Sequence, residues 1–132
     1  MKNKTTIEAI IHNTPYKTTI QAGNHTLTSD EPIENGGKDK GFNPFELLLS
    51  SLGSCMAITM KMYAERKDWD IGEVKVELAM EKEGEYTVIN RKVTFSDDLT
   101  AEQQKRLKQI ANACPIHKIL TTKTVISSLK EV

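Results

Sequence analysis

Several features are scarce in this chain of 132 residues, and each scarcity excludes a group of functions. Aromatic residues make up only 5% of the sequence, too few for the base-stacking platforms of proteins that bind single-stranded nucleic acid. The 18 basic and 18 acidic residues cancel, so no net charge attracts nucleic acid or an anionic membrane. No run approaches 18 consecutive apolar residues, and we therefore expect no membrane-spanning helix and no membrane partner.

Cysteine is equally scarce, with only Cys55 and Cys114, which lie 59 positions apart (114 minus 55). Residues 1–11 lack the apolar run and the small-residue cleavage site of a secretory signal, which predicts a cytoplasmic protein. In a reducing cytoplasm a cysteine pair is more often catalytic or redox-sensing than structural. The length predicts one domain that covers residues 1–132.

The pattern of apolar and turn-forming residues predicts an α+β domain. The expected strands cover residues 5–11, 16–21, 25–29, 74–80, 86–95 and 122–129. The Gly23-Asn24 pair predicts a two-residue hairpin turn, and a shift of the apolar positions predicts a β-bulge near Ile89. A loop covers residues 30–43, and shorter helices are expected to begin after Thr100 and after Cys114.

A central helix of about 22 residues is predicted to begin at Asn43, a suitable N-cap, followed by Pro44 at the first helical position. Glu46 lies three residues after the cap, where its carboxylate completes a capping box. Apolar residues cover nearly every face of this helix, which predicts burial on most sides. A chain of this size does not surround such a helix easily, so we expect a homodimer that buries it between two subunits.

The local sequence treats the two cysteines differently. If Pro115 begins a helix, Cys114 lies at its N-cap, where unpaired N–H groups and the helix dipole favour a thiolate. His117 and Lys118 lie within the same turn. Cys55 lies about three turns into the central helix, and it needs a cation or a hydrogen-bond donor from elsewhere to become a nucleophile.

Two other interpretations of these residues stay open. Each cysteine is adequately explained as a small buried side chain, since free cysteine is among the most buried residue types. The spacing from Cys114 to His117 also matches half of a zinc site, but structural zinc needs four ligands and no second close pair exists. We therefore expect no metal.

Glu46 lies nine residues before Cys55, about 180° around the helix, so direct contact between them is not expected.

Taken together, the two cysteine motifs resemble those of the OsmC/Ohr family. The segment from Pro44 to Cys55 resembles the central-helix motif of the family, and the segment from Ala113 to Leu120 resembles its second-cysteine motif. The order of the expected elements also fits, so the resemblance covers nearly the whole chain. The resemblance implies an intertwined homodimer, in which β-strands wrap around two long central helices and the active sites lie at the subunit interface.

The resemblance further implies thiol-dependent reduction of small organic hydroperoxides, with no cofactor. Carried over by motif, Cys55 would attack the peroxide and become a sulfenic acid, and Cys114 would resolve it to a disulfide that a cellular dithiol reduces. Glu46 and His117 would support this chemistry. Phe42, Phe45 and the loop before them would line an apolar entrance for the substrate.

The sequence departs from the peroxidases of this family at two positions. In those proteins Glu directly follows the helix-opening Pro, but that position here is Phe45, and Glu46 points about 100° away. They also use an Arg from the N-terminal β-region, whereas the first Arg here is Arg66. An OsmC-like dimer that binds a small apolar ligand, or that senses redox state, is therefore the alternative hypothesis.

Overall fold

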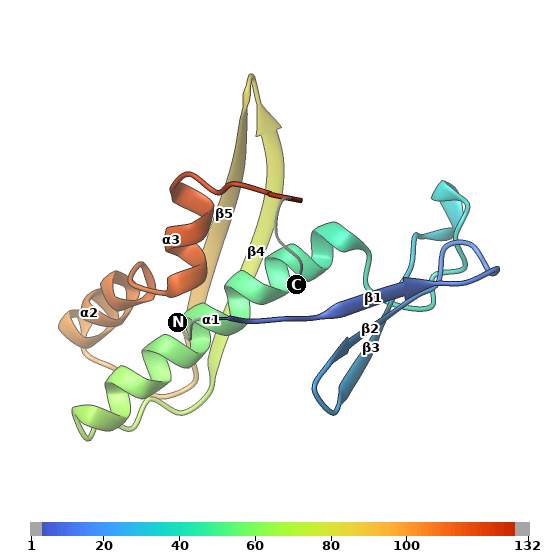
Figure 1. The fold of residues 1–132 in the computed structure, drawn as a ribbon. Helices are drawn as coiled ribbons and strands as arrows, with labels where there is room; N and C mark the ends of the chain where they lie inside the picture. Colours follow the sequence, from blue (N-terminus) through green and yellow to red (C-terminus); the bar gives the residue numbers. More distant parts are fainter. Residues whose placement is uncertain (1–3, 129–132) are drawn as a thin grey trace. The chain divides into compact units, whose positions relative to one another are not determined.

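A computed structural model describes residues 4–128 and groups them into two compact units, each considered by itself here (Figure 1). The first unit comprises residues 4–48 with 127–128, and the second comprises residues 49–126. The elements follow the order β1, β2, β3, a 3-10 helix η1, α1, β4, β5, α2 and α3. This is the α+β arrangement expected from the sequence, with a long central helix and antiparallel strands.

The first unit is built on a three-stranded antiparallel sheet in the order β1-β2-β3. Its strands are Glu8–Ile11, Thr18–Ala22 and His25–Ser29. The third has the expected bounds, the first begins three residues later than expected, and the second is shifted by one or two residues. Ala22 pairs with His25, so Gly23 and Asn24 form the predicted two-residue turn. Gly23 has a φ of 58°, the left-handed conformation that glycine adopts without strain and that such turns require.

Asp30 organises the segment that follows β3. Its side chain is buried and accepts hydrogen bonds from four backbone N–H groups, those of Tyr16, Glu31, Lys38 and Lys40, at 2.8–3.3 Å. Burial alone raises the pKa of the Asp30 carboxyl group, but the four donors outweigh burial and hold the pKa below its usual value. The expected loop is thus held by one ionised side chain, and it contains η1 (Ile33–Asn35).

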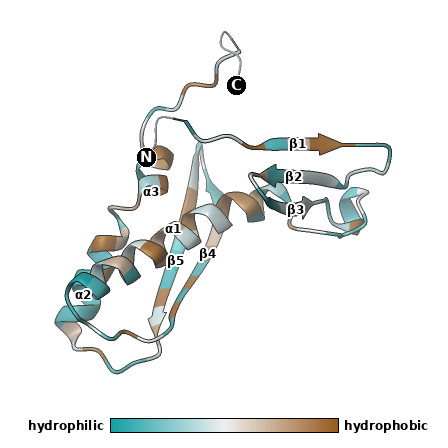
Figure 2. Ribbon diagram, turned by 60° about the horizontal axis from the view of Figure 1, so that its bottom comes forward, coloured by the Kyte–Doolittle hydropathy of each residue, from teal (hydrophilic) through white to brown (hydrophobic). Residues whose placement is uncertain are grey.

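Helix α1 covers Pro44–Arg66, in agreement with the predicted length and start. The Asn43 N–H donates to Glu46 Oε1, and the Glu46 N–H donates to Asn43 Oδ1, both at 2.8 Å. The predicted capping box is therefore formed, and it accounts for the position of Glu46. Figure 2 shows hydrophobic residues recurring along α1.

Strands β4 (Val74–Glu83) and β5 (Tyr86–Phe95) form an antiparallel hairpin against one side of α1. The predicted bulge near Ile89 is wrong, because the register runs without interruption from Val74 opposite Phe95 to Glu83 opposite Tyr86. The apolar positions shift because Tyr86 and Val88 lie on the opposite face of β5 from Ile89, Val93 and Phe95, which pack against the core. Arg91 lies on the same face as these three residues.

Helices α2 (Ala101–Ala111) and α3 (Pro115–Thr121) lie beside α1 and complete the second unit. Thr100 and Gln103 form the predicted capping box of α2. The core is formed where α1, α2 and the N-cap of α3 meet, together with Ile71 in the segment between α1 and β4. Its buried apolar residues are Leu52, Met56, Met60, Ala64, Ile71, Leu107, Ala111 and Cys114.

The predicted last strand is wrong over residues 122–128, which form no strand, and Leu129 lies outside the described residues. The β-branched residues of this segment gave it strand propensity, but a strand also needs a hydrogen-bonded neighbour. Val125 and Ile126 are 73% and 97% exposed, which is consistent with the missing pairing.

Helix α1 is long and apolar, and much of it is not buried within the chain. By length and composition alone α1 could cross a membrane, which is weak evidence because core helices of soluble proteins pass the same test. Only 28% of the residues in its most apolar 18-residue window are buried within the chain.

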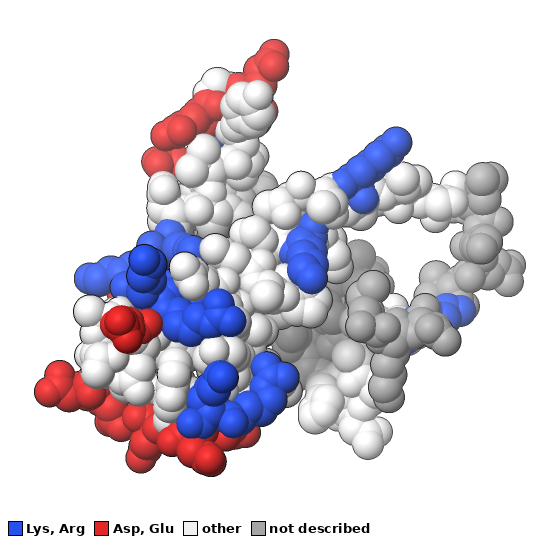
Figure 3. All heavy atoms as spheres, turned by 90° about the vertical axis from the view of Figure 1, so that its left-hand side faces the viewer, with Lys and Arg blue, Asp and Glu red and all other residues white. Residues whose placement is uncertain are grey.

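Charged side chains of both signs lie on the face of the molecule shown in Figure 3, and neither positive nor negative charge dominates that face.

Candidate functional site

The structure brings the two cysteines together in the second unit. Cys55 lies half-buried on α1, and Cys114 is fully buried at the N-cap of α3. Both thiols are free, and Cys55 packs against the core cluster that contains Cys114, close enough for its thiol to raise the pKa of Cys114. A disulfide requires the two sulfurs to approach to about 2.05 Å, and these neighbouring side chains are placed to form one after a local shift.

The N-cap position of Cys114 is confirmed. Its Sγ accepts a hydrogen bond of 3.3 Å from the His117 N–H, and Pro115 occupies the first helical position. This contact and that of the Ile116 N–H lower the pKa of Cys114. Burial of the thiol is the larger effect, and together with the contact to Cys55 it raises the pKa above its usual value.

The expectation that Cys114 is the activated thiol is therefore wrong. A helix N-terminus favours the thiolate by a modest amount, whereas complete removal of the sulfur from water opposes ionisation more strongly. A protonated, buried Cys114 is poorly suited to attack a substrate. It is better suited to meet an electrophilic sulfur that forms on its neighbour, Cys55.

The pKa shift of Cys114 predicts how its alkylation depends on pH. Because folding raises this pKa, the protonated thiol persists to higher pH in the native protein than in the unfolded chain. The associated contribution to stability is present below the pKa of the unfolded thiol and is lost as pH rises through the folded pKa. Iodoacetamide alkylation of Cys114, followed by peptide mass spectrometry, should therefore rise at higher pH in native protein than in urea-unfolded protein. A native profile at lower pH than the unfolded one would contradict the assignment.

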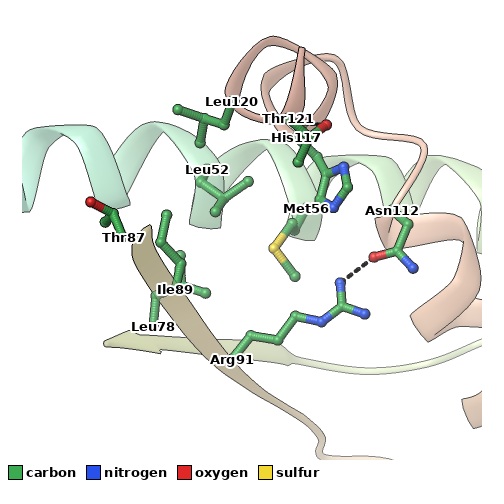
Figure 4. A pocket seen from close by; sticks show the side chains of 10 residues that line it. All are labelled: Leu52, Met56, Leu78, Thr87, Ile89, Arg91, Asn112, His117, Leu120 and Thr121. Carbon is green, nitrogen blue, oxygen red and sulfur yellow. Dashed lines mark hydrogen bonds between the residues drawn. The ribbon is translucent and has the colours of Figure 1, made fainter. Parts of the chain in front are cut away.

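A pocket of about 320 Å³ lies beside the cysteine pair, between α1, the β4–β5 hairpin, α3 and the residue after α2 (Figure 4). Neither cysteine lines it, but Met56 directly follows Cys55, and His117 is the residue whose N–H contacts Cys114. One side of the pocket is apolar, and the other carries polar groups. The lining residues are Leu52, Met56, Leu78, Thr87, Ile89, Arg91, Asn112, His117, Leu120 and Thr121.

Arg91 is the pocket residue that sequence reasoning missed. Its Nη1 donates a hydrogen bond of 2.5 Å to Oδ1 of Asn112 (Figure 4). The signal was present in the strand pattern, since Arg91 falls between Ile89 and Val93 on the alternation of core-facing residues. The predicted bulge rested instead on the change from Tyr86 and Val88 to Ile89 and Val93, and it left open the side of the strand on which Arg91 lies.

Of the other predicted site residues, only His117 lines the pocket. His117 is half-buried and lines the pocket, close to the cysteine pair. Phe42 and Phe45 belong to the first unit and are 55% and 65% exposed, so their role as a substrate entrance stays a prediction. Glu46 is engaged as the capping partner of Asn43. Among residues 4–128, no three His, Cys, Asp or Glu side chains gather as a metal site.

The sequence and the fold are similar to those of known proteins. The sequence profile of the family described as OsmC-like protein matches residues 37–128. The uncharacterized protein YmaD of Bacillus subtilis (strain 168) is 35% identical over 77 residues, which are 58% of this chain and 49% of that protein. The match to this curated relative thus spans about half of its length.

Solved structures share the fold over most of the chain. A candidate osmotic stress induced and detoxification response protein of Psychrobacter arcticus 273-4 is 25% identical with a TM-score of 0.76, and 89% of each chain is covered. OhrB, the organic hydroperoxide resistance protein of Bacillus subtilis, is 18% identical with a TM-score of 0.63, covering 89% of this chain and 90% of that one. A candidate organic hydroperoxide resistance protein of Vibrio cholerae, solved with captopril in one of its active sites, is 18% identical with a TM-score of 0.65, covering 92% and 86%. At 18% identity, the last two show similarity of fold alone.

Proposed function

Because this chain belongs to the OsmC-like family, whose relatives include hydroperoxide resistance proteins, we propose that it reduces organic hydroperoxides through Cys55 and Cys114. The observation that carries the proposal is the contact between a half-buried and a fully buried thiol at the junction of α1 and α3. Two free cysteines in contact suit a protein that cycles in a reducing cytoplasm.

The proposed cycle transfers two electrons from the thiols to the peroxide. The Cys55 thiolate attacks the terminal peroxide oxygen, the O–O bond breaks, and the alkoxide leaves as an alcohol after taking a proton. Cys55 is then a sulfenic acid. The Cys114 sulfur attacks the Cys55 sulfur, the S–O bond breaks, water leaves, and an S–S bond forms. A cellular dithiol reduces this disulfide by exchange and restores both thiols.

A homodimer belongs to the same proposal. The long apolar helix α1 leaves most of its most apolar window unburied within one chain, and a second copy of α1 would cover it.

Turnover measurement tests the proposed activity. Reduced protein should consume tert-butyl hydroperoxide catalytically when a dithiol such as dithiothreitol is supplied, because the disulfide must be reduced in each cycle. Consumption at the rate of the dithiol alone would refute the activity.

A binding function is the second candidate, favoured by the absence of an Arg before residue 66 and by the capping role of Glu46. In that case a small apolar ligand should raise the melting temperature of the reduced protein while hydroperoxide turnover stays at background.

A further inference from the structure

We propose that the pocket beside the cysteine pair is a binding site for an amphipathic carboxylate, with Arg91 holding the acid group and the aliphatic tail lying against the apolar wall. This site goes beyond hydroperoxide chemistry, because it concerns ligand binding to the reduced protein and holds whether or not the thiols turn over. The carrying observation is an arginine placed on the inner face of a strand, inside a pocket.

The strand register shows that Arg91 lies on the face of the hairpin that carries mostly apolar residues. Five cross-strand pairs lie on the face of the hairpin that packs against the core, and the pair nearest the turn, Lys82 with Thr87, is polar. Three of them join apolar residues, and their members are Val74 with Phe95, Val76 with Val93, and Met80 with Ile89. In the remaining pair Leu78 lies opposite Arg91. An apolar residue at this position would extend the core stripe, whereas Arg91 is exposed and presents its guanidinium to the open pocket.

The chain satisfies only part of the hydrogen-bonding capacity of this guanidinium. Arg91 donates one hydrogen bond to Asn112, whose amide is neutral, while a guanidinium has five N–H donors. No acidic residue lines the pocket, and among residues 4–128 no ion pair involves Arg91. Solvent screens the charge of the exposed Arg91, and no acidic side chain at the wall of the pocket neutralises it, so the guanidinium is open to an anionic ligand. A carboxylate accepts two parallel hydrogen bonds from guanidinium, which is the strongest neutralising partner of this size.

The remaining lining residues select the rest of the ligand. Figure 4 shows Arg91, Asn112 and His117 toward one side of the pocket and Leu52, Leu78, Ile89 and Leu120 toward the other. A volume of about 320 Å³ is at the lower end of ligand pockets, which suits a small molecule with a single aliphatic chain. The geometry fits a medium-chain aliphatic acid better than a neutral hydrocarbon or a polyanion.

The test compares two probes of equal chain length, octanoate and 1-octanol, by calorimetric titration of the full-length reduced protein. We expect octanoate to bind more tightly than 1-octanol. Arg91→Gln keeps a donor for Asn112 but removes the charge, so it should weaken octanoate by at least about tenfold and leave 1-octanol within about twofold. Leu120→Ser, on the apolar side, should weaken both probes.

Arg106→Gln is the matched control, because Arg106 donates to the Tyr63 hydroxyl at 3.0 Å and does not line the pocket. This variant should bind both probes as the unaltered protein does. Thermal unfolding of each variant shows that it is folded, and Arg91→Lys, which keeps the charge, should retain part of the preference for octanoate. Equal affinity for both probes, loss of both in Arg91→Gln, or no binding of octanoate would overturn the proposal.

Discussion

Replacement of Cys55 by serine is expected to reduce hydroperoxide consumption by at least about a hundredfold, because a hydroxyl cannot replace the thiolate as the attacking group. Cys55 is the candidate for the first attack because it is the more exposed member of the pair and its partner is buried and protonated. Stopped-flow measurement of peroxide consumption by reduced variant protein, without added dithiol, isolates this first step.

Cys114→Ser is the matched control, since it makes the same change on the other member of the pair. It should leave the first step intact and stop the reaction at a Cys55 sulfenic acid, which dimedone traps for mass spectrometry. Equal loss of the first step in both variants would contradict the assignment of roles. Loss in Cys114→Ser alone would reverse it.

Glutamate at two exposed apolar positions of α1 is expected to convert the proposed dimer into a monomer. Ile58 and Met62 are 53% and 60% exposed within one chain and lie one helical turn apart. Covering the remainder of each side chain contributes about 1 kcal/mol. Twofold symmetry repeats each contact, so the double variant should weaken the dimer by at least about 4 kcal/mol, about a thousandfold in Kd.

Sedimentation velocity measures this effect directly. Tyr86→Glu is the matched control, because Tyr86 is 77% exposed at the tip of the β4–β5 hairpin and not on α1. It should leave the oligomeric state unchanged. A monomeric unaltered protein, or a double variant that remains dimeric, would exclude the helix face from an interface.

Much of the fold could be predicted from short-range signals. Capping residues fixed the starts of α1 and α2, and Pro115 fixed the start of α3, because caps and proline act within one turn of the chain. The Gly23-Asn24 turn was equally local. The predicted last strand was wrong because strand formation depends on a partner that local sequence does not reveal.

The site was harder to predict than the fold, because its properties depend on contacts between distant residues. Helix-end chemistry predicted an activated Cys114, but burial of its sulfur and its contact with Cys55 reverse the direction of the pKa shift. Neither effect is visible in the local sequence. Arg91 was missed for a related reason. Its inward position follows only from the unbroken register with β4.

If Cys55 and Cys114 act as one redox pair, the fate of both thiols after oxidation shows it directly. Reduced protein is treated with one equivalent of tert-butyl hydroperoxide, blocked with iodoacetamide and digested without reductant for mass spectrometry. We expect a peptide pair linked through Cys55 and Cys114, formed within one chain and reversed by a dithiol. Recovery of both cysteines as alkylated thiols after excess peroxide would contradict it.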